Sequence, residues 1–258
     1  MGTVRFSVDT HIATVVLANE GRFNAMSLSM WRQLAQVLEQ LRADDAVRVL
    51  VLRGEGDRAF VSGADISEFG AQRSSPDGVV AYDAAVDQAQ TGLAEFPRPV
   101  IAAISGICYG GGMGLALGCD LRYAAPTARF RMPAARLGLG YALNGMQRMV
   151  DVLGAPNASE LFYTARVCDA QEALRIGLVN AVPQDCFAHA AQVAAQIAAN
   201  APLTIAAAKL AIQTVLSGRQ EARAAAVAQA VRTCFESRDY VEGRQAFAEK
   251  RPPEFTGR

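Results

Sequence analysis

The chain has 258 residues, of which 51% are hydrophobic and 19% are charged, which suits a folded protein with one large domain, or with a core domain and a smaller appendage. Its 25 basic and 25 acidic residues give a formal net charge of zero. This balance, and the lack of any run of five basic residues, argues against nucleic acid or an anionic membrane surface as the main partner.

The cysteine content indicates a reducing compartment. Five cysteines occur, an odd number without a CxxC pair or a Cys/His cluster. We therefore expect a cytoplasmic location in which the thiols stay reduced and pack as small hydrophobic groups. The first residues also lack the apolar run of a signal peptide.

The N-terminal region predicts a hairpin, a helix and a buried strand. Apolar residues alternate in VRFSVDTHIATVVLAN, so we expect two strands that end near Asn19. Ser27 or Ser29 is expected to cap an amphipathic helix. The apolar face of this helix holds Trp31, Leu34, Leu38 and Leu41. The uninterrupted run VRVLVLRGEG then predicts a strand of a sheet that is buried on both faces.

The same order of elements recurs further along the chain. A helix is predicted near residues 82–95, followed by a break at Pro97 and Pro99 and a strand in VIAAISG. Successive strand, turn and helix units indicate an α/β fold. The hairpin at the start makes the predicted sheet mixed rather than purely parallel. Residues 1–190 are interpreted as a core domain and residues 191–258 as a helical C-terminal region, since alanine-rich helical sequence runs from about residue 187 to residue 249.

One segment has the length of a membrane span. Residues 100–119 carry no charge, but six of these twenty residues are glycine. We therefore expect a buried strand, a turn and a helix there rather than a spanning helix.

Two glycine-bearing turns are the main candidates for a functional site. FVSGADISEF and ISGICYGGGMGLALGCD each predict the end of an apolar strand, a turn and the start of a helix. The backbone N–H groups at a helix start have no acceptor within the helix, so two such turns facing each other could bind one oxygen that becomes negative during a reaction. The alternative is a pair of tight connections whose glycines only allow close packing.

At this point the sequence resembles a known family. NEGRFNAMS, AFVSGADISEF, PVIAAISGICYGGGMGLALGCDLRYAAPTARFRMP, LGLGYALNGMQRMVDVLGA, EALRIGLVNAVP and EGRQAFAEKRPPEFTGR resemble, in this order, the signature segments of the crotonase superfamily, the enoyl-CoA hydratase/isomerase family. The resemblance implies a crotonase-like spiral of strand-strand-helix units and an acyl-CoA thioester as substrate. It leaves the reaction open, because this family hosts several reactions on one scaffold.

The resemblance also implies roles for individual residues. The N–H groups of Ala64 and Gly111 would bind the thioester oxygen. The two glutamates of family hydratases are replaced here by Gly114 and Ala134, and the aspartate of a dehalogenase-like variant is replaced by Ala142.

Other polar residues could supply acid or base chemistry. Tyr141 resembles a tyrosine of family members that decarboxylate malonyl thioesters, and it could also be an ordinary loop residue whose hydroxyl bonds the backbone. Further acid/base candidates are Glu68, Asp83 and Asp87. Asp65 is expected to cap a helix, Asp120 to be structural, and His11 and His189 to lie away from both turns.

Coenzyme A enters as part of the substrate, and no metal or redox cofactor is implied. By resemblance, residues 62–66, of which Ser62, Asp65 and Ile66 are the candidates, would bind the adenine and the thioester arm. Arg22 could bind a phosphate, and Phe247 and Lys250 could reach coenzyme A in a neighbouring subunit of a homotrimer or dimer of trimers, although Arg22 and Lys250 could equally be surface charges.

Three functional hypotheses remain open. The first is a hydratase/isomerase-type enzyme with altered acid/base groups. The second is an acyl-CoA decarboxylase or thioester hydrolase assisted by Tyr141. The third is a non-catalytic acyl-CoA-binding protein that retains the pocket.

Overall fold

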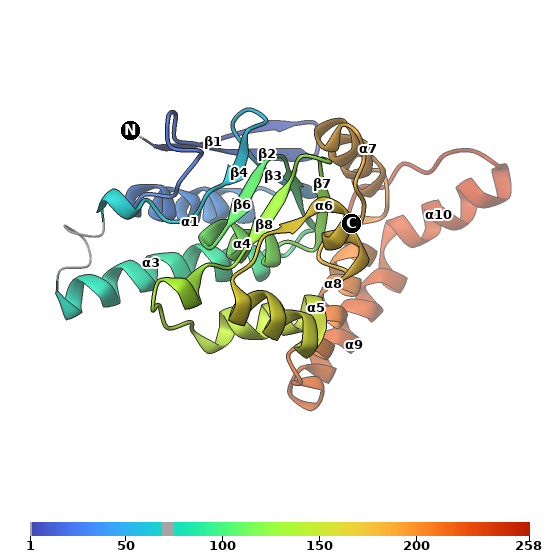
Figure 1. The fold of residues 1–258 in the computed structure, drawn as a ribbon. Coiled ribbons are helices and arrows are strands. Elements are labelled where there is room, and N and C mark those ends of the chain that lie inside the picture. The colour runs from blue at the N-terminus through green and yellow to red at the C-terminus, as the bar shows by residue number, and fades with distance from the viewer. Residues whose placement is uncertain (1, 69–74) are drawn as a thin grey trace.

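The computed structural model describes residues 2–68 and 75–258, and within them two β-sheets lie at the centre with helices packed around them (Figure 1). The larger described sheet has the order β1-β2-β3-β5-β7, with the bounds Thr3–Asp9, Ile12–Ala18, Val49–Gly54, Val100–Ile104 and Leu121–Ala124. The smaller described sheet has the order β4-β6-β8-β9, with the bounds Ala59–Val61, Ile107–Tyr109, Arg129–Arg131 and Cys168–Asp169.

The helices of the described chain fall into a core set and a C-terminal set. The core set is α1 Leu28–Ala43, α3 Pro76–Ala94, α4 Gly111–Leu117, α5 Leu143–Thr164, α6 Ala170–Arg175 and the short 3-10 helices η1 Ile66–Glu68 and η2 Ala134–Arg136. The C-terminal set is α7 Cys186–Ala198, α8 Pro202–Leu216, α9 Gln220–Glu236 and α10 Arg238–Glu249.

Three consecutive strand pairs divide between the two sheets. β3, β5 and β7 join the larger sheet in parallel, whereas β4, β6 and β8, which follow each of them, join the smaller sheet in parallel. A helical segment follows each pair, so the chain winds as a spiral of strand-strand-helix units and ends in helices. This confirms the expected fold class, and the antiparallel pairing of β1 with β2 confirms the mixed sheet.

Both faces of the larger sheet are buried, as the uninterrupted apolar strands predict. Val49 and Val51 of β3 pack with Ala190 and Ala194 of α7. Leu50 and Leu52 pack on the opposite face, in the main core with α1 and the smaller sheet. Because successive side chains of a strand point to opposite faces, an entirely apolar strand needs a cover on both sides.

The helix starts follow the capping rules. The Ser27 hydroxyl accepts the N–H of Met30 at 3.2 Å, which confirms the first of the two proposed caps. α3 begins at Pro76, earlier than expected, because Ser75 caps it and proline suits the first helical position. After the first glycine turn the chain forms only the three-residue η1 instead of a longer helix.

The uncharged segment 100–119 forms β5, β6 and α4, as expected, with β6 as an additional short strand. No single helix in residues 2–68 and 75–258 is long and apolar enough to cross a membrane. One pair, α7 and α8, meets the length and composition criteria together, but it is bent by 109°.

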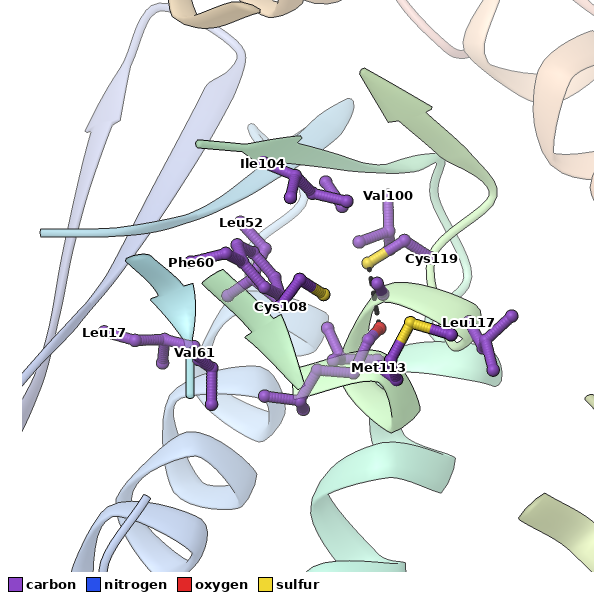
Figure 2. Close-up of a cluster of buried hydrophobic side chains, with 14 of the residues drawn as sticks. Leu17, Leu52, Phe60, Val61, Val100, Ile104, Cys108, Met113, Leu117 and Cys119 are labelled. Atoms are coloured by element: carbon purple, nitrogen blue, oxygen red, sulfur yellow. Dashed lines mark hydrogen bonds between the residues drawn. The ribbon is translucent and has the colours of Figure 1, made fainter. Parts of the chain in front are cut away.

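The cysteines behave as small hydrophobic groups. Cys108 and Cys119 lie among Leu52, Phe60 and Met113 in the core (Figure 2). The Cys119 thiol donates to the backbone oxygen of Leu115, and burial raises its pKa to about 12. A thiol with such a pKa stays protonated and unreactive at neutral pH.

The C-terminal set divides into an attached and a protruding part. α7 covers the larger sheet, so the expected domain boundary at residue 190 falls inside a helix. The Lys209 ammonium of α8 is buried and pairs with the Asp120 carboxylate at 2.7 Å. In contrast, α9 has no buried residue, and α10 extends away from α3 (Figure 1).

The glycine triplet is required by close packing at the start of α4. Gly110 has φ 48° and ψ −109°, a conformation that side chains disfavour. A Cβ on Gly112 would lie 2.3 Å from the backbone oxygen of Val61, at the end of β4. The first turn of α4 therefore rests directly on the backbone of the neighbouring strand.

We predict that Gly112→Ala destabilises the protein by about 1–3 kcal/mol, because the added methyl group must displace a backbone carbonyl. Urea unfolding followed by circular dichroism measures this change. Gly140→Ala is the control, since its Cβ would meet no atom within 4 Å. Equal stability of the two variants would contradict the proposed packing constraint.

Candidate active site

A cavity of about 280 Å³ opens where three strands of the smaller sheet end. The residues that follow β4, β6 and β8 all reach it, namely Ser62 to Ala64, Gly110 to Gly111, and Met132 to Ala134. Because parallel strands point their carboxyl ends to one edge, the topology brings together turns that are far apart in the sequence. Trp31, α3 and the loop 137–145 complete the wall.

The two glycine turns meet at this cavity. A Cβ built on Gly111 would lie 3.7 Å from the backbone nitrogen of Ala64. Neither the Ala64 nor the Gly111 N–H donates to an acceptor among the described residues, whereas the neighbouring Gly110 N–H bonds Arg131 at 2.9 Å. Two backbone donors without a partner among the described residues thus lie side by side on one wall.

Ala64 is held by a parallel bridge to Met26. The Met26 N–H donates to Gly63 at 2.8 Å, and the Asp65 N–H donates to Met26 at 2.9 Å. These two bonds involve the Gly63 carbonyl and the Asp65 N–H, which flank the Ala64 N–H in the chain. The Ala64 N–H itself is not bonded to Met26. Gly63 has φ 125°, a conformation that only glycine adopts readily.

Gly114 and Ala134 have different surroundings. Ala134 is buried and lines the cavity. A Cβ on Gly114 would lie 2.3 Å from Nε2 of Gln90, so the Gln90 side chain of α3 occupies the space beside Gly114. Ala142 also lines the cavity.

Tyr141 lines the cavity from the loop before α5. Its ring packs edge-on against Phe162 with centroids 5.5 Å apart, and its hydroxyl forms no hydrogen bond with a described residue. Burial raises the pKa of Tyr141, and the positive charge of Arg148 opposes this rise. The hydroxyl therefore stays protonated at neutral pH and can donate into the cavity.

The acidic candidates separate into two groups. Asp83 and Asp87 line the cavity from α3, and the Asp87 carboxylate accepts the side-chain amide of Asn144. Glu68 instead accepts the N–H of Leu28 at 2.8 Å and so caps α1. Glu68 is absent from the described residues that line the cavity.

Asp65 and Asp120 have structural partners. Asp65 accepts the Ser67 N–H at 3.1 Å, as expected of a capping residue, and Arg22 at 2.8 Å. The pKa of Asp65 lies below its usual value because these bonds outweigh its desolvation. Asp120 accepts the Val100 N–H and pairs with Lys209, in agreement with a structural role.

The residues expected to bind coenzyme A are spread over the molecule. Ser62 lines the cavity, and its hydroxyl donates to the backbone oxygen of Arg22 at 3.2 Å. Ile66 belongs to η1, and its side chain lies outside the described features. Phe247, which is 87% exposed, and Lys250 do not line the cavity of their own described chain.

The histidines lie apart from the cavity. His11 Nδ1 is 2.7 Å from the backbone oxygen of Ala46, and His189 packs on Tyr123 with centroids 4.5 Å apart. Neither is among the described residues that line the cavity. A histidine base at this site is therefore excluded by geometry.

Several residues of the cavity wall are not among the predicted site residues, and the polar or aromatic ones include Trp31, Gln90 and Asn144. A signal for Gln90 was present, because residues 83, 87 and 90 have the spacing of one helix face. The helix had been identified, but the direction in which this face points depends on the tertiary structure.

The fold and the site define a class of α/β spiral proteins with a ligand cavity walled by two glycine turns. A family model described as enoyl-CoA hydratase/isomerase matches residues 8–258. The short-chain-enoyl-CoA hydratase of Clostridium acetobutylicum is 33% identical over 242 residues, which cover 93% of this chain and 92% of that protein.

Solved structures agree with this match. An enoyl-CoA hydratase/carnithine racemase from Magnetospirillum magneticum has a TM-score of 0.92 at 36% identity, covering 100% of this chain and 97% of that one. An enoyl-CoA hydratase from Bacillus anthracis has a TM-score of 0.93 at 32% identity, covering 99% of both chains. The chain belongs to the enoyl-CoA hydratase/isomerase family.

We predict that Tyr141 ionises only above the ordinary tyrosine pKa of about 10, because burial disfavours the phenolate. The difference in phenolate absorbance between the wild type and Tyr141→Phe, followed from pH 7 to 12, measures this. The stability contributed by the neutral buried phenol is complete below about pH 10 and decreases as the pH rises above it. A phenolate that forms below pH 9 and disappears in the variant would contradict the burial.

Proposed function

We propose that this chain is an acyl-CoA-processing enzyme that stabilises a thioester enolate. The observation that carries the proposal is the pair of unpartnered N–H groups of Ala64 and Gly111 on one cavity wall. Preformed backbone donors stabilise an oxygen as it becomes negative, and each is typically worth roughly 3–4 kcal/mol in the transition state. The named activity of the Clostridium relative, on an enoyl-CoA, supports a thioester as the ligand.

The reaction proceeds without the usual pair of hydratase glutamates. Gly114 and Ala134 cannot transfer protons, so any base or acid comes from other groups at the cavity. Tyr141 is a proton donor at neutral pH, and Asp83 and Asp87 are carboxylates at its edge. A hydratase/isomerase-type reaction would therefore use altered acid/base groups and would hydrate crotonyl-CoA slowly.

The unbonded Tyr141 hydroxyl favours a second candidate, an acyl-CoA decarboxylase. In that reaction the bond from the α-carbon to the carboxylate breaks, carbon dioxide leaves, and the electron pair remains in the enolate. The enolate then receives a proton from Tyr141 or water at the α-carbon. No base is needed to start this reaction, which suits a cavity that lacks both glutamates.

Coenzyme A would be held as part of the substrate. The backbone and side chains of Ser62, Asp65 and Ile66 would contact its adenine and thioester arm, and Arg22 a phosphate. Arg22 already pairs with Asp65 and Ser67, while its side chain is 52% exposed, so a phosphate would compete with these partners. Phe247 and Lys250 would act from a neighbouring subunit.

Turnover of a thioester panel tests the proposed function. Purified protein is incubated with crotonyl-, methylmalonyl-, malonyl- and aryl-acyl-CoA, and the products are followed by mass. Decarboxylation that is lost in Tyr141→Phe would support the second candidate. Coenzyme A binding without any turnover would leave a non-catalytic binder, and rapid crotonyl-CoA hydration would contradict the altered acid/base groups.

We predict that Gly111→Pro lowers kcat about 10²–10³-fold relative to Gly111→Ala. Both variants place a Cβ near Trp31, but only proline removes the N–H, and proline is accepted at the first position of a helix. Steady-state kinetics on the best thioester of the panel measures the ratio. Equal rates of the two variants would show that this N–H does not act on the reaction.

We further predict a homo-oligomer, a homotrimer or a dimer of trimers, formed through the C-terminal helices. Apolar side chains there are exposed in the described single chain, namely Ile212, Val215, Phe235, Val241 and Phe247. Phe235→Glu should lower the mass measured by sedimentation equilibrium, whereas Val80→Glu on α3, which is also exposed, should not. A monomeric wild type would contradict the prediction.

A further inference from the structure

Gln90 of α3 is a buried residue whose carboxamide reaches the cavity. The residue is only 6% exposed and lines the cavity from α3. Its carboxamide forms no hydrogen bond with any described residue, although each such group carries two donors and an acceptor. Among the described residues the only fully buried side-chain nitrogen or oxygen without a hydrogen-bond partner is Nε of Arg42, so the polar atoms of Gln90 stay open to the cavity, where a ligand can bind them.

The position of the Gln90 carboxamide is fixed by α4. A Cβ on Gly114 would lie 2.3 Å from Nε2 and 2.8 Å from Cδ of Gln90, so glycine at 114 is what makes room for the amide. Gly114 lies one turn along α4 from the Gly111 N–H, about 5 Å along the axis. A ligand oxygen bound by Gln90 would therefore lie close to the thioester oxygen rather than at the far end of an acyl chain.

The charged residues around the cavity indicate which kind of ligand oxygen can bind beside Gln90. Asp83 and Asp87 lie on the same side of α3, and both are exposed at the cavity wall. Among the described residues that line the cavity there is no lysine or arginine. An acyl carboxylate would therefore approach the Asp87 carboxylate and meet no cation among the described lining residues, whereas a neutral hydroxyl or carbonyl oxygen matches an amide that can donate and accept.

From this geometry we propose that Gln90 is a specificity-determining residue that hydrogen-bonds a neutral hydroxyl or carbonyl oxygen on the second or third carbon of the acyl group. The proposal rests on the proposed function as an acyl-CoA enzyme of the hydratase/isomerase type, since it concerns the acyl part of a bound thioester, and it argues against the decarboxylase candidate, whose substrate carries a carboxylate. In this proposal Gln90 of α3 makes the polar contact with the acyl group, because Gly114 of α4 has no side chain that could make it. The substrate class is then an oxygen-substituted acyl thioester rather than a plain alkyl one.

The single tryptophan of the chain provides the measurement. Trp31 lines the same cavity, so its fluorescence reports ligands that enter. Dissociation constants are measured for butyryl-, 3-hydroxybutyryl-, acetoacetyl- and malonyl-CoA with the wild type, Gln90→Leu and Gln88→Leu. Gln88 lies on the same helix but is exposed and does not line the cavity, so it is the matched control.

We expect the wild type and Gln88→Leu to bind 3-hydroxybutyryl- or acetoacetyl-CoA about tenfold more tightly than butyryl-CoA, and malonyl-CoA least tightly. Gln90→Leu should lose this preference while still binding butyryl-CoA, because leucine keeps the volume and removes the hydrogen bonds. Circular dichroism and thermal melting establish that the variants fold.

Two outcomes would overturn the proposal, and they differ in what they say of the proposed function. Equal binding of butyryl-CoA and the oxygen-substituted thioesters by the wild type would refute the role of Gln90 but keep an acyl-CoA site. Failure of every thioester to bind the wild type would refute both. Because the first comparison uses only the wild type, the test does not depend on the folding of Gln90→Leu.

Discussion

The approach of the first turn of α4 to the backbone at the end of β4 is the contact on which the site depends. A Cβ at Gly112 would lie 2.3 Å from the Val61 oxygen, and one at Gly111 would lie 3.0 Å from the buried ring of Trp31. Only a chain without side chains can approach so closely. This close approach places the Gly111 N–H beside the Ala64 nitrogen, although 46 residues lie between Ala64 and Gly111 in the sequence.

Buried charge holds the opposite end of α4. The Arg122 guanidinium donates to the backbone oxygens of Cys119 at 2.6 Å and Leu178 at 2.7 Å, and burial lowers its pKa. The buried Lys209, whose pKa is also lowered by desolvation, bonds Asp120 just after the helix. One end of α4 therefore faces the cavity with free N–H groups, while its carboxyl end is fixed by cations, which keeps the donors in place.

Position 114 of α4 and Gln90 of α3 share one volume at the cavity. A side chain at Gly114 and the carboxamide of Gln90 compete for the same volume, so an acid on α4 and this amide on α3 exclude each other. The carboxamide that fills this volume can donate and accept hydrogen bonds but, unlike a carboxyl group, does not transfer a proton. The two glycine turns and the Gln90 carboxamide are thus carried by separate elements, and one can change while the other stays.

The sequence by itself determined the α/β class, the buried sheet, a cap at Ser27 or Ser29 and the two glycine turns, because apolar periodicity, capping and glycine are local signals, while the spiral was implied by the family resemblance. The family resemblance also predicts that Gly114 and Ala134 stand where family hydratases have acids. The short strands of the smaller sheet and the capping role of Glu68 were not recognisable, since three residues show no period and a cap on α1 comes from a residue 40 positions away. Only the tertiary structure decided that Gln90 enters the cavity, because the direction of a helix face is set by what the helix packs against.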